Sequence, residues 1–229
     1  MNPRHEPRRD VCAIIPCYNE ARTIGRIIRS VKVHVAEVLV IDDCSTDNTR
    51  AEARAAGAIV LSHPRNLGKG VGLKTGFTAA AEMGFSAAVT LDGDGQHDST
   101  EIPLFLEAYD RGDCDIVLGN RMNDTRSMPR IRRVTNRFTS WVISRMVRTP
   151  ISDTQCGFRL IGLKFWQAVR LNSSRFDLES EILIKACRSG ARLRQVQIRT
   201  IYFGTEDSKI HPVLDTVRFF QLLWRCRNA

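Results

Sequence analysis

Short apolar runs alternate with segments of helical periodicity along the first 120 residues. Five runs are rich in β-branched residues and bounded by turn formers, which is typical of buried strands: residues 11–15, 37–41, 58–61, 87–91 and 116–118. Residues 24–31 and 102–109 show the i, i+3, i+4, i+7 apolar spacing of one helix face. This alternation predicts an α/β fold with a Rossmann-like, mostly parallel sheet flanked by helices.

Beyond residue 120 the chain becomes basic and amphipathic. In residues 121–148 arginines are interleaved with apolar residues that share a helical stripe: Ile131, Val134, Phe138, Trp141, Val142 and Met146. Strand-like pieces follow at 158–161 and 193–201, with a helix around 181–189 between them, and 212–225 has the pattern of a final amphipathic helix. We expect a disordered or extended tail over residues 1–10 and a single domain over 11–229, divided into halves at 11–120 and 121–229.

The composition is that of an ordinary globular protein with an excess of positive charge. Of the 229 residues 43% are apolar and 26% charged, the formal net charge is +9, and only six of the 34 basic residues are lysine. Arginine forms bidentate hydrogen bonds with phosphate, so this bias favours a phosphate-bearing partner: a nucleotide, a nucleic acid or a phospholipid surface.

Several classes of protein are disfavoured by the same inspection. No run of about 18 apolar residues is long enough to span a membrane. The polar residues 1–10 are not followed by the apolar segment of a signal peptide. The seven cysteines are scattered without a C-x-x-C pair, which indicates reduced thiols and argues against zinc. These features predict a cytoplasmic location.

The sharpest motif is Asp92-Gly93-Asp94, directly after the apolar run 87–91. Alternate residues of an extended segment point the same way, and a glycine between them lets a ligand approach the backbone closely. Two facing carboxylates repel each other unless a cation lies between them, and Mg²⁺ or Mn²⁺ is usually held by one or two carboxylates with phosphate oxygens. Gln96 could add a neutral oxygen. The alternative is a solvated acidic turn.

Polar residues follow the other strands as well. Residues 16–20 come after the first strand, and Asp42 and Asp43 end the second. A carboxylate there could accept hydrogen bonds from a base or a ribose, while Asp47 or Thr46 could cap the next helix. Because parallel sheets bind ligands beyond the carboxyl ends of their strands, we expect these groups to converge on one edge.

The glycine-rich segment 66–72 resembles a phosphate loop only superficially. It lacks the Gly-Lys-Ser/Thr of a Walker motif and does not complete a dinucleotide fingerprint. We interpret it as a tight turn into a helix, either structural or with Lys69 near a phosphate.

The basic segment 121–148 has three readings. Arginines beside Trp and Phe suit a membrane interface, where anionic headgroups attract the charge. The apolar stripe could instead pack on the sheet as in an ordinary surface helix. Nucleic-acid binding ranks lower, because the sequence shows no helix-turn-helix, zinc or RNA-binding signature.

Taken together, five motifs resemble those of family 2 glycosyltransferases with the GT-A fold, and most closely the branch of dolichol-phosphate mannose synthases and bacterial polyprenyl-phosphate glycosyltransferases. They are IPCYNE (15–20), VIDDCSTD (40–47), NLGKG (66–70), DGDGQH (92–97) and SDTQCGFR (152–159). The resemblance runs from residue 11 to about residue 210 in the family's order and spacing.

The resemblance implies transfer of a hexose from a nucleotide-sugar, of the GDP-mannose or UDP-glucose type, to a polyprenyl or dolichyl phosphate at the cytoplasmic membrane face. It implies inversion at the anomeric carbon and a Mg²⁺ or Mn²⁺ cofactor. Together with the pattern of the basic helix, it leads us to expect peripheral attachment to the membrane through that helix. The residues that match the nucleotide-sugar site are Pro16, Tyr18, Glu20, Ile41, Asp43, Asp92, Gly93, Asp94, Gln96 and Lys209, of which Asp92, Asp94 and Gln96 would hold the metal. Arg121, Arg133 and Asn136 match the acceptor-phosphate site.

The expected chemistry assigns a different role to each group of these residues. The leaving group is a nucleoside diphosphate, whose charge a metal, an arginine and a lysine would stabilise. The acceptor phosphate is already ionised, so no strong general base is required. Asp94 and Arg121 are therefore the expected catalytic residues, together with Asp153, which could orient the acceptor or the cation, a role also open to Asp177.

Two residues of one loop depart from the resemblance. In the loop before Lys209, Phe203 and Glu206 stand where the family pattern has arginine and glycine. The loss of a cation and the added carboxylate weaken the expectation that this loop grips the donor diphosphate, and they leave a different sugar or a different acceptor open. A GT-A enzyme acting on a saccharide or another hydroxyl compound would need a general base, and a basic nucleic-acid-binding module is the lower alternative.

Overall fold

The computed structural model describes residues 6–122, 125, 128–169, 177–199 and 201. The strands are β1 (Arg8–Cys17), β2 (Val35–Asp42), β3 (Ile59–Ser62), β4 (Ala87–Thr90), β5 (Ile116–Asn120), β6 (Arg159–Gly162) and β7 (Leu193–Gln197). The helices are α1 (Ile24–Val31), α2 (Thr49–Ala55), α3 (Lys69–Glu82), α4 (Ile102–Asp110), α5 (Arg130–Val147), α6 (Leu163–Ala168) and α7 (Asp177–Arg188), with a 3₁₀ turn at Ser99–Glu101.

The strands form one sheet in the order β3-β2-β1-β4-β6-β5-β7. All neighbouring pairs are parallel except those of β6, which runs antiparallel to both β4 and β5. The expected mostly parallel sheet is thus confirmed. Because β6 is reversed, its first residue Arg159 lies beside Thr90 and Leu118, so the loop before β6 reaches the same edge as the carboxyl ends of the parallel strands.

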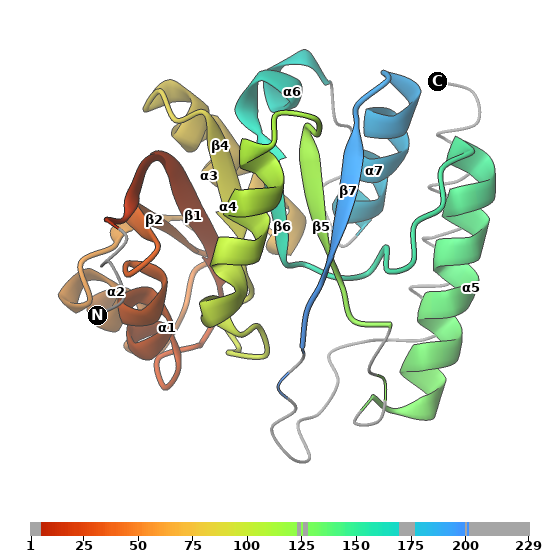
Figure 1. The fold of residues 1–229 in the computed structure, drawn as a ribbon. Coiled ribbons are helices and arrows are strands. Elements are labelled where there is room, and N and C mark those ends of the chain that lie inside the picture. Colours follow the sequence, from red (N-terminus) through yellow and green to blue (C-terminus); the bar gives the residue numbers. More distant parts are fainter. Residues whose placement is uncertain (1–5, 123–124, 126–127, 170–176, 200, 202–229) are drawn as a thin grey trace, which may run out of the picture.

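Helices cover both faces of the sheet (Figure 1). The core on one face joins the strands to α1, α2 and α4, and the core on the other face joins them to α3, α5, α6 and α7. Burial of these apolar side chains is the main driving force for the layered arrangement. It leaves the loops at the carboxyl edge free to present polar groups.

The segment predicted to be a tight turn into a helix has that structure. Gly68 has φ +92°, a backbone conformation that favours glycine, and α3 starts at the next residue, Lys69.

The bounds of two strands differ from expectation. Residues 8–10, expected in a disordered or extended tail, are extended and form the start of β1. The strand expected over 193–201 ends at Gln197. The helix expected at 212–225 lies outside the described residues. Strands from both sides of residue 120 share the sheet, so the division of the chain at that point remains a prediction about function.

Close packing between α3 and the sheet gives a first testable prediction. A Cβ at Gly76 would lie 2.4 Å from Ile14 Cγ2, so Gly76→Ala should destabilise the protein by about 1–3 kcal/mol through overpacking. In the matched control Gly25→Ala, on α1, the nearest atom is 3.5 Å away, and the gain in helix propensity should be neutral or stabilising by up to about 1 kcal/mol. Urea unfolding of both variants measures the difference, and equal effects would contradict it.

Candidate active site

The loops that follow β1 and β2 are joined into one unit. Asn19, with φ +58°, donates its backbone N–H to Ser45 Oγ at 2.9 Å, and its side-chain oxygen accepts the Thr46 N–H at 2.8 Å. The Glu20 N–H donates to Thr49 Oγ1 at 2.8 Å. The Tyr18 side chain is exposed at this edge. The first two predicted clusters of polar residues therefore lie side by side.

Asp43 holds the loop that leads into α3. Its carboxylate accepts the backbone N–H groups of Leu67 at 2.8 Å and Gly68 at 2.7 Å, and it pairs with His63 Nδ1 at 2.8 Å. His63 in turn contacts Thr75 Oγ1 at 3.0 Å. The expected contact of Asp43 with a nucleotide stays a prediction, and the visible role of this carboxylate is to fix the turn before Lys69.

Pro16 and Ile41 are buried partners in the β1–β2 ladder. A Cβ at Gly72 on α3 would lie 3.3 Å from Pro16 Cβ and 3.8 Å from Ile41 Cγ2. Both side chains thus pack against α3, and they would form the floor of a nucleotide pocket rather than its polar wall.

The turn after β4 brings the DGDGQH motif to the same edge. The Gln96 N–H donates to Asp94 Oδ1 at 2.9 Å, and the Asp92 N–H donates to His97 Nδ1 at 3.2 Å. The His97 ring is buried and stacks on Phe158, with ring centroids 5.3 Å apart. The stack of His97 on Phe158 therefore helps to fix the position of the turn.

Glycines bring this turn close to its neighbours. A Cβ at Gly93 would lie 2.8 Å from Cys17 Sγ and 3.3 Å from Glu20 Cγ. Because Gly93 has no side chain, the end of β1 and the loop after it can pack closely against this turn. Gly93 positions Glu20 beside the Asp92–Asp94 turn, and its direct approach to a ligand stays a prediction.

The two motif carboxylates differ in their electrostatic environment. Burial raises the pKa of Asp92, but the Lys69 ammonium, 2.6 Å away, outweighs it and lowers the pKa to about 2. Burial and the nearby charge of Asp92 raise the pKa of Asp94 above its ordinary value. Burial lowers the pKa of His97, which disfavours the charged form of the ring.

This environment fits a divalent cation. Burial and the neighbouring charge of Asp92 both disfavour the charged form of Asp94, and added positive charge would offset them. Within the residues described, no group of three or more His, Cys, Asp or Glu side chains could enclose a metal ion by itself. Mg²⁺ is usually bound by one or two carboxylates together with substrate phosphates, and Asp92 and Asp94 suit that arrangement.

A second polar cluster is built around Asp153, in the loop before β6. Arg121, just after β5, donates to it from Nε at 2.7 Å and from Nη2 at 3.0 Å, and Asn136 Nδ2 on α5 donates to Oδ1 at 2.8 Å. Burial raises the pKa of Asp153, but hydrogen bonds and charge from Arg121 outweigh it and keep it below its ordinary value. Three residues predicted separately from the sequence are thus brought together.

The remaining predicted residues lie farther along the chain. Arg133 on α5 donates from Nη1 to Thr125 Oγ1 at 3.4 Å. Asp177 is the first residue of α7. Lys209, Phe203 and Glu206 lie outside the described residues.

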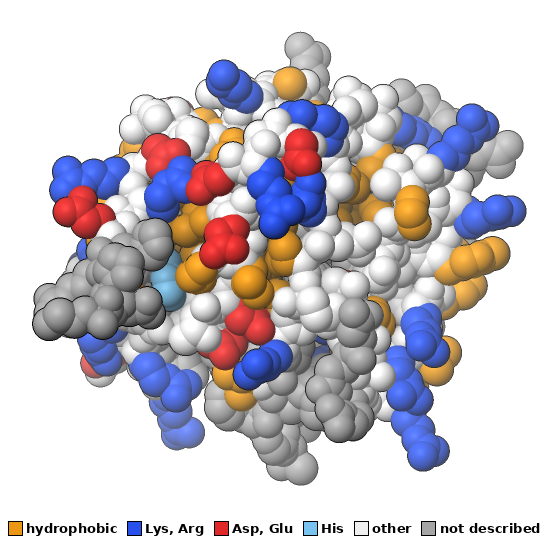
Figure 2. Space-filling model, in the orientation of Figure 1, with side chains coloured by type: hydrophobic (Ala, Val, Ile, Leu, Met, Phe, Trp, Pro, Cys, Tyr) orange, Lys and Arg blue, Asp and Glu red, His pale blue; other side chains and the backbone are white. Residues whose placement is uncertain are grey.

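The orientation of α5 tests one of the three readings of its amphipathic pattern. Its buried residues are Asn136, Thr139, Ser140 and Ile143, and its large exposed apolar residues are Ile131 (73%), Val134 (65%), Phe138 (48%) and Trp141 (61%). Orange apolar and blue basic side chains alternate along the edge where α5 lies (Figure 2). For these four residues the reading that the stripe packs on the sheet is wrong, because hydrogen bonds to the Asp153 loop turn the polar face inward.

Sequence reasoning missed two sets of contacts that shape the site, those of Lys69 and of Arg159. Lys69 Nζ pairs not only with Asp92 but also with Glu179 Oε1 on α7, at 3.2 Å. Arg159 is fully buried and donates to the carbonyl oxygens of Cys156, Thr154 and Glu179. Neither link follows a sequence periodicity, because both join segments far apart in the chain.

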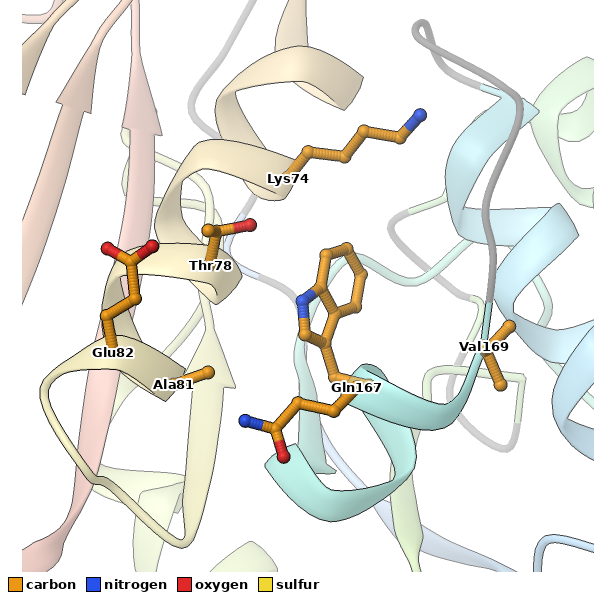
Figure 3. A pocket seen from close by; sticks show the side chains of 7 residues that line it. Lys74, Thr78, Ala81, Glu82, Gln167 and Val169 are labelled. Carbon is orange, nitrogen blue, oxygen red and sulfur yellow. The ribbon is translucent and has the colours of Figure 1, made fainter.

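A pocket of about 390 Å³ lies elsewhere, between α3 and α6 (Figure 3). It is lined by Lys74, Thr78, Ala81, Glu82, Trp166, Gln167 and Val169. Because α6 follows the end of β6, where Gly162 pairs with the first residue of β4, this pocket belongs to the opposite edge of the sheet. It has no part in the site described above.

Comparison with known proteins identifies similar sequences over most of the chain. The family model for glycosyl transferase family 2 matches residues 12–166. The UDP-N-acetylglucosamine–dolichyl-phosphate N-acetylglucosaminyltransferase of Methanococcus voltae is 27% identical over 212 residues, covering 82% of this chain and 84% of that protein. The undecaprenyl-phosphate mannosyltransferase of Micrococcus luteus is 29% identical over 215 residues, covering 87% of each.

Among solved structures, the fold is similar to that of glucosyl-3-phosphoglycerate synthase from Mycobacterium tuberculosis in complex with Mn²⁺, uridine diphosphate and glucosyl-3-phosphoglycerate. The TM-score is 0.73 at 19% identity, covering 95% of this chain and 80% of that one. This likeness confirms the GT-A fold class expected from the sequence. No helix within the described part of this chain is long and apolar enough to cross a membrane.

Proposed function

Because this chain belongs to glycosyltransferase family 2, we propose that it transfers a hexose from a nucleotide diphosphate sugar to the phosphate of a polyprenol, with inversion at the anomeric carbon. The observation that carries the proposal is the two-sided character of α5. One side contributes Asn136 to the Arg121–Asp153 cluster, and the other exposes apolar side chains and arginines. A single helix thus reaches from a lipid-compatible surface to residues suited to a phosphate. The names of the polyprenyl-phosphate relatives support the same acceptor class.

On the donor side, Asp92, Asp94 and Gln96 would hold Mg²⁺ or Mn²⁺, which would balance the negative charge of the sugar diphosphate. The chain supports this role by fixing the turn: His97 accepts the Asp92 N–H, and Gly93 packs on the end of β1. A preorganised turn loses little entropy when charge develops on the leaving group.

On the acceptor side, Arg121, Arg133 and Asn136 would bind the lipid phosphate. Asp153 holds Nε and Nη2 of Arg121, which sets the orientation of the guanidinium group. The acceptor phosphate is an anion at neutral pH, so its oxygen is nucleophilic without a general base. His97 is a weak candidate for a general base, because burial lowers its pKa and its Nδ1 already accepts a backbone hydrogen bond.

We place the exposed face of α5 at an anionic membrane surface on the cytoplasmic side. Four large apolar side chains are exposed on it, and Arg130, Arg137 and Arg145 are exposed on the same helix. A helix of this kind binds the interface by burying its apolar residues among the acyl chains while its arginines contact lipid phosphates. Positive charge beside an apolar stripe favours this occupant over an uncharged protein surface.

A transfer assay tests the proposed reaction. The purified protein is incubated with radiolabelled GDP-hexoses or UDP-hexoses, Mn²⁺ and polyprenyl phosphate, and a labelled lipid is the expected product. The unphosphorylated polyprenol serves as the matched control and should accept no sugar. Labelling of a saccharide or another hydroxyl compound, without any labelling of lipid phosphate, would contradict the proposed acceptor.

Membrane binding through α5 makes a separate prediction. The double variant Phe138→Ala, Trp141→Ala should bind vesicles of equal parts phosphatidylcholine and phosphatidylglycerol at least about tenfold more weakly. The reason is that burying one large apolar side chain in the membrane contributes about 1.5–3 kcal/mol of binding free energy. Co-sedimentation with the vesicles measures binding. The control is Met83→Ala, Leu104→Ala, two residues exposed elsewhere, with unchanged binding.

Two results would contradict this placement of α5. If residues beyond 201 cover the stripe, the double variant should lose thermal stability while vesicle binding stays unchanged. If a second copy of the chain covers it, the variant should change the oligomeric state in the absence of vesicles.

A further inference from the structure

Lys69 lies between two carboxylates from different parts of the chain. Its Nζ is 2.6 Å from Asp92 Oδ1 and 3.2 Å from Glu179 Oε1. Asp92 belongs to the proposed metal-binding turn, whereas Glu179 is on α7 and has no part in it. One ammonium is therefore shared between a carboxylate proposed to bind the cation and one that is not.

The backbone around Lys69 is fixed. The two residues before it donate their N–H groups to Asp43, and Lys69 itself begins α3. On the other side, a Cβ at Gly157 would lie 3.0 Å from Lys69 Nζ and 3.1 Å from Asp92 Oδ2. The ammonium is thus held in a narrow space in which it touches both acids.

The charge balance of this space changes when a cation enters. Lys69 forms an ion pair with Asp92, and a divalent ion at the same carboxylate would repel the ammonium at short range. Glu179 is already within ion-pair distance of Lys69. The Lys69 ammonium can therefore keep its ion pair with Glu179 when its contact with Asp92 is lost, without a large movement of the side chain.

We propose that Lys69 is a positioning residue that acts as a built-in counter-cation for Asp92, competing with the divalent ion, and that Glu179 takes over the ammonium when the ion binds. The inference rests on the proposed metal dependence and goes beyond it by naming the residues that set how tightly the ion is held. The competition would disfavour binding of the free ion and favour its arrival with the donor diphosphate, whose negative charge offsets the ammonium.

The test measures Mn²⁺ binding directly, from the electron paramagnetic resonance signal of free Mn²⁺, without donor or lipid. Lys69→Gln removes the competing charge and should lower the Kd for Mn²⁺ at least about tenfold. Lys69→Arg keeps the charge and should stay within about twofold of the natural protein. Glu179→Gln removes the second partner, leaves the ammonium on Asp92, and should raise the Kd by about threefold or more.

Opposite directions for Lys69→Gln and Glu179→Gln are the signature of the proposal, because a merely structural triad would weaken binding in both variants. Lys164→Gln, at an exposed lysine on α6, removes the same charge and should leave the Kd unchanged. Unchanged or weaker binding in Lys69→Gln overturns the proposal, as does the absence of Mn²⁺ binding in all variants. If Lys69→Gln fails to fold, tighter Mn²⁺ binding by Glu179→Gln would overturn it equally.

The measurement also separates this inference from the proposed reaction. Because neither sugar donor nor lipid is present, a failure to transfer sugar to polyprenyl phosphate has no bearing on the Kd values. Equal Mn²⁺ binding in the natural protein and Lys69→Gln would leave metal binding intact and remove only the role of Lys69.

Discussion

Asp94→Asn is expected to lower glycosyl transfer by about 10³-fold or more, because it removes a charged ligand at the point where the diphosphate charge must be balanced. The carboxylate lies beside Asp92, and burial together with that neighbour raises its pKa. Asparagine keeps the shape and can still accept the Gln96 N–H, so the folded turn should survive. Initial rates at saturating Mn²⁺ measure the loss.

The matched control for Asp94→Asn is Asp98→Asn in the same turn. Asp98 accepts the Thr100 N–H and caps the 3₁₀ turn Ser99–Glu101. Its replacement should cost at most about 1 kcal/mol of stability and leave the rate within about threefold. If Asp94→Asn retained a tenth or more of the natural rate, the assignment of Asp94 to the metal would be lost.

Asp153→Asn is expected to destabilise the protein by about 3 kcal/mol, because it removes the carboxylate charge that pairs with the buried Arg121 guanidinium. For a chain of this length, the melting temperature should fall by about 6–12 °C. Transfer should fall as well, since Arg121 would lose the bidentate contact that orients it. Calorimetry and rate measurements on the same preparation report both effects.

The pH dependence of this variant follows from the direction of the pKa shift. Burial opposes the charged form of Asp153, but Arg121 outweighs it, so the folded-state pKa is below the ordinary value. The stability that this provides is complete above the unfolded pKa of about 3.9 and is lost as the pH falls through the folded pKa. The difference between natural protein and variant should therefore be constant from pH 7 to 5 and shrink below about pH 4.

An exposed pair supplies the control for Asp153→Asn. Asp113 pairs with Arg194 at the surface, where both side chains are partly exposed. Asp113→Asn should change stability by less than about 1 kcal/mol, because water already solvates both charges. Equal destabilisation by the two substitutions would contradict the role assigned to burial.

The sequence predicted most of the fold because it depends on local patterns. Each of the five early strands is a β-branched run between turn residues, and each contains or overlaps a strand of the structure. The spacing of apolar residues in 24–31 matches the whole of α1. Such patterns report which side of an element is buried, and burial largely determines secondary structure.

The position of β6 in the sheet could not be predicted from such local patterns. Its four residues pair with β4 and β5 in the antiparallel direction, although it follows both in the chain with α5 between. No periodicity specifies a partner so distant in sequence. The insertion matters for the site, because it carries Asp153 to Arg121 and Gly157 to Lys69 and Asp92.

By itself, the sequence determined the fold class, the family motifs and the acidic turn at Asp92 and Asp94, because these are properties of short continuous segments. Only the tertiary structure decided which face of α5 is exposed and which group neutralises Asp92. In α5, Asn136 faces inward and donates a hydrogen bond to Asp153, whereas Phe138 and Trp141 on the other side of the helix are exposed. At Asp92, the partner is Lys69, and such pairings follow from close packing of distant segments, which the amino-acid pattern of one segment does not encode.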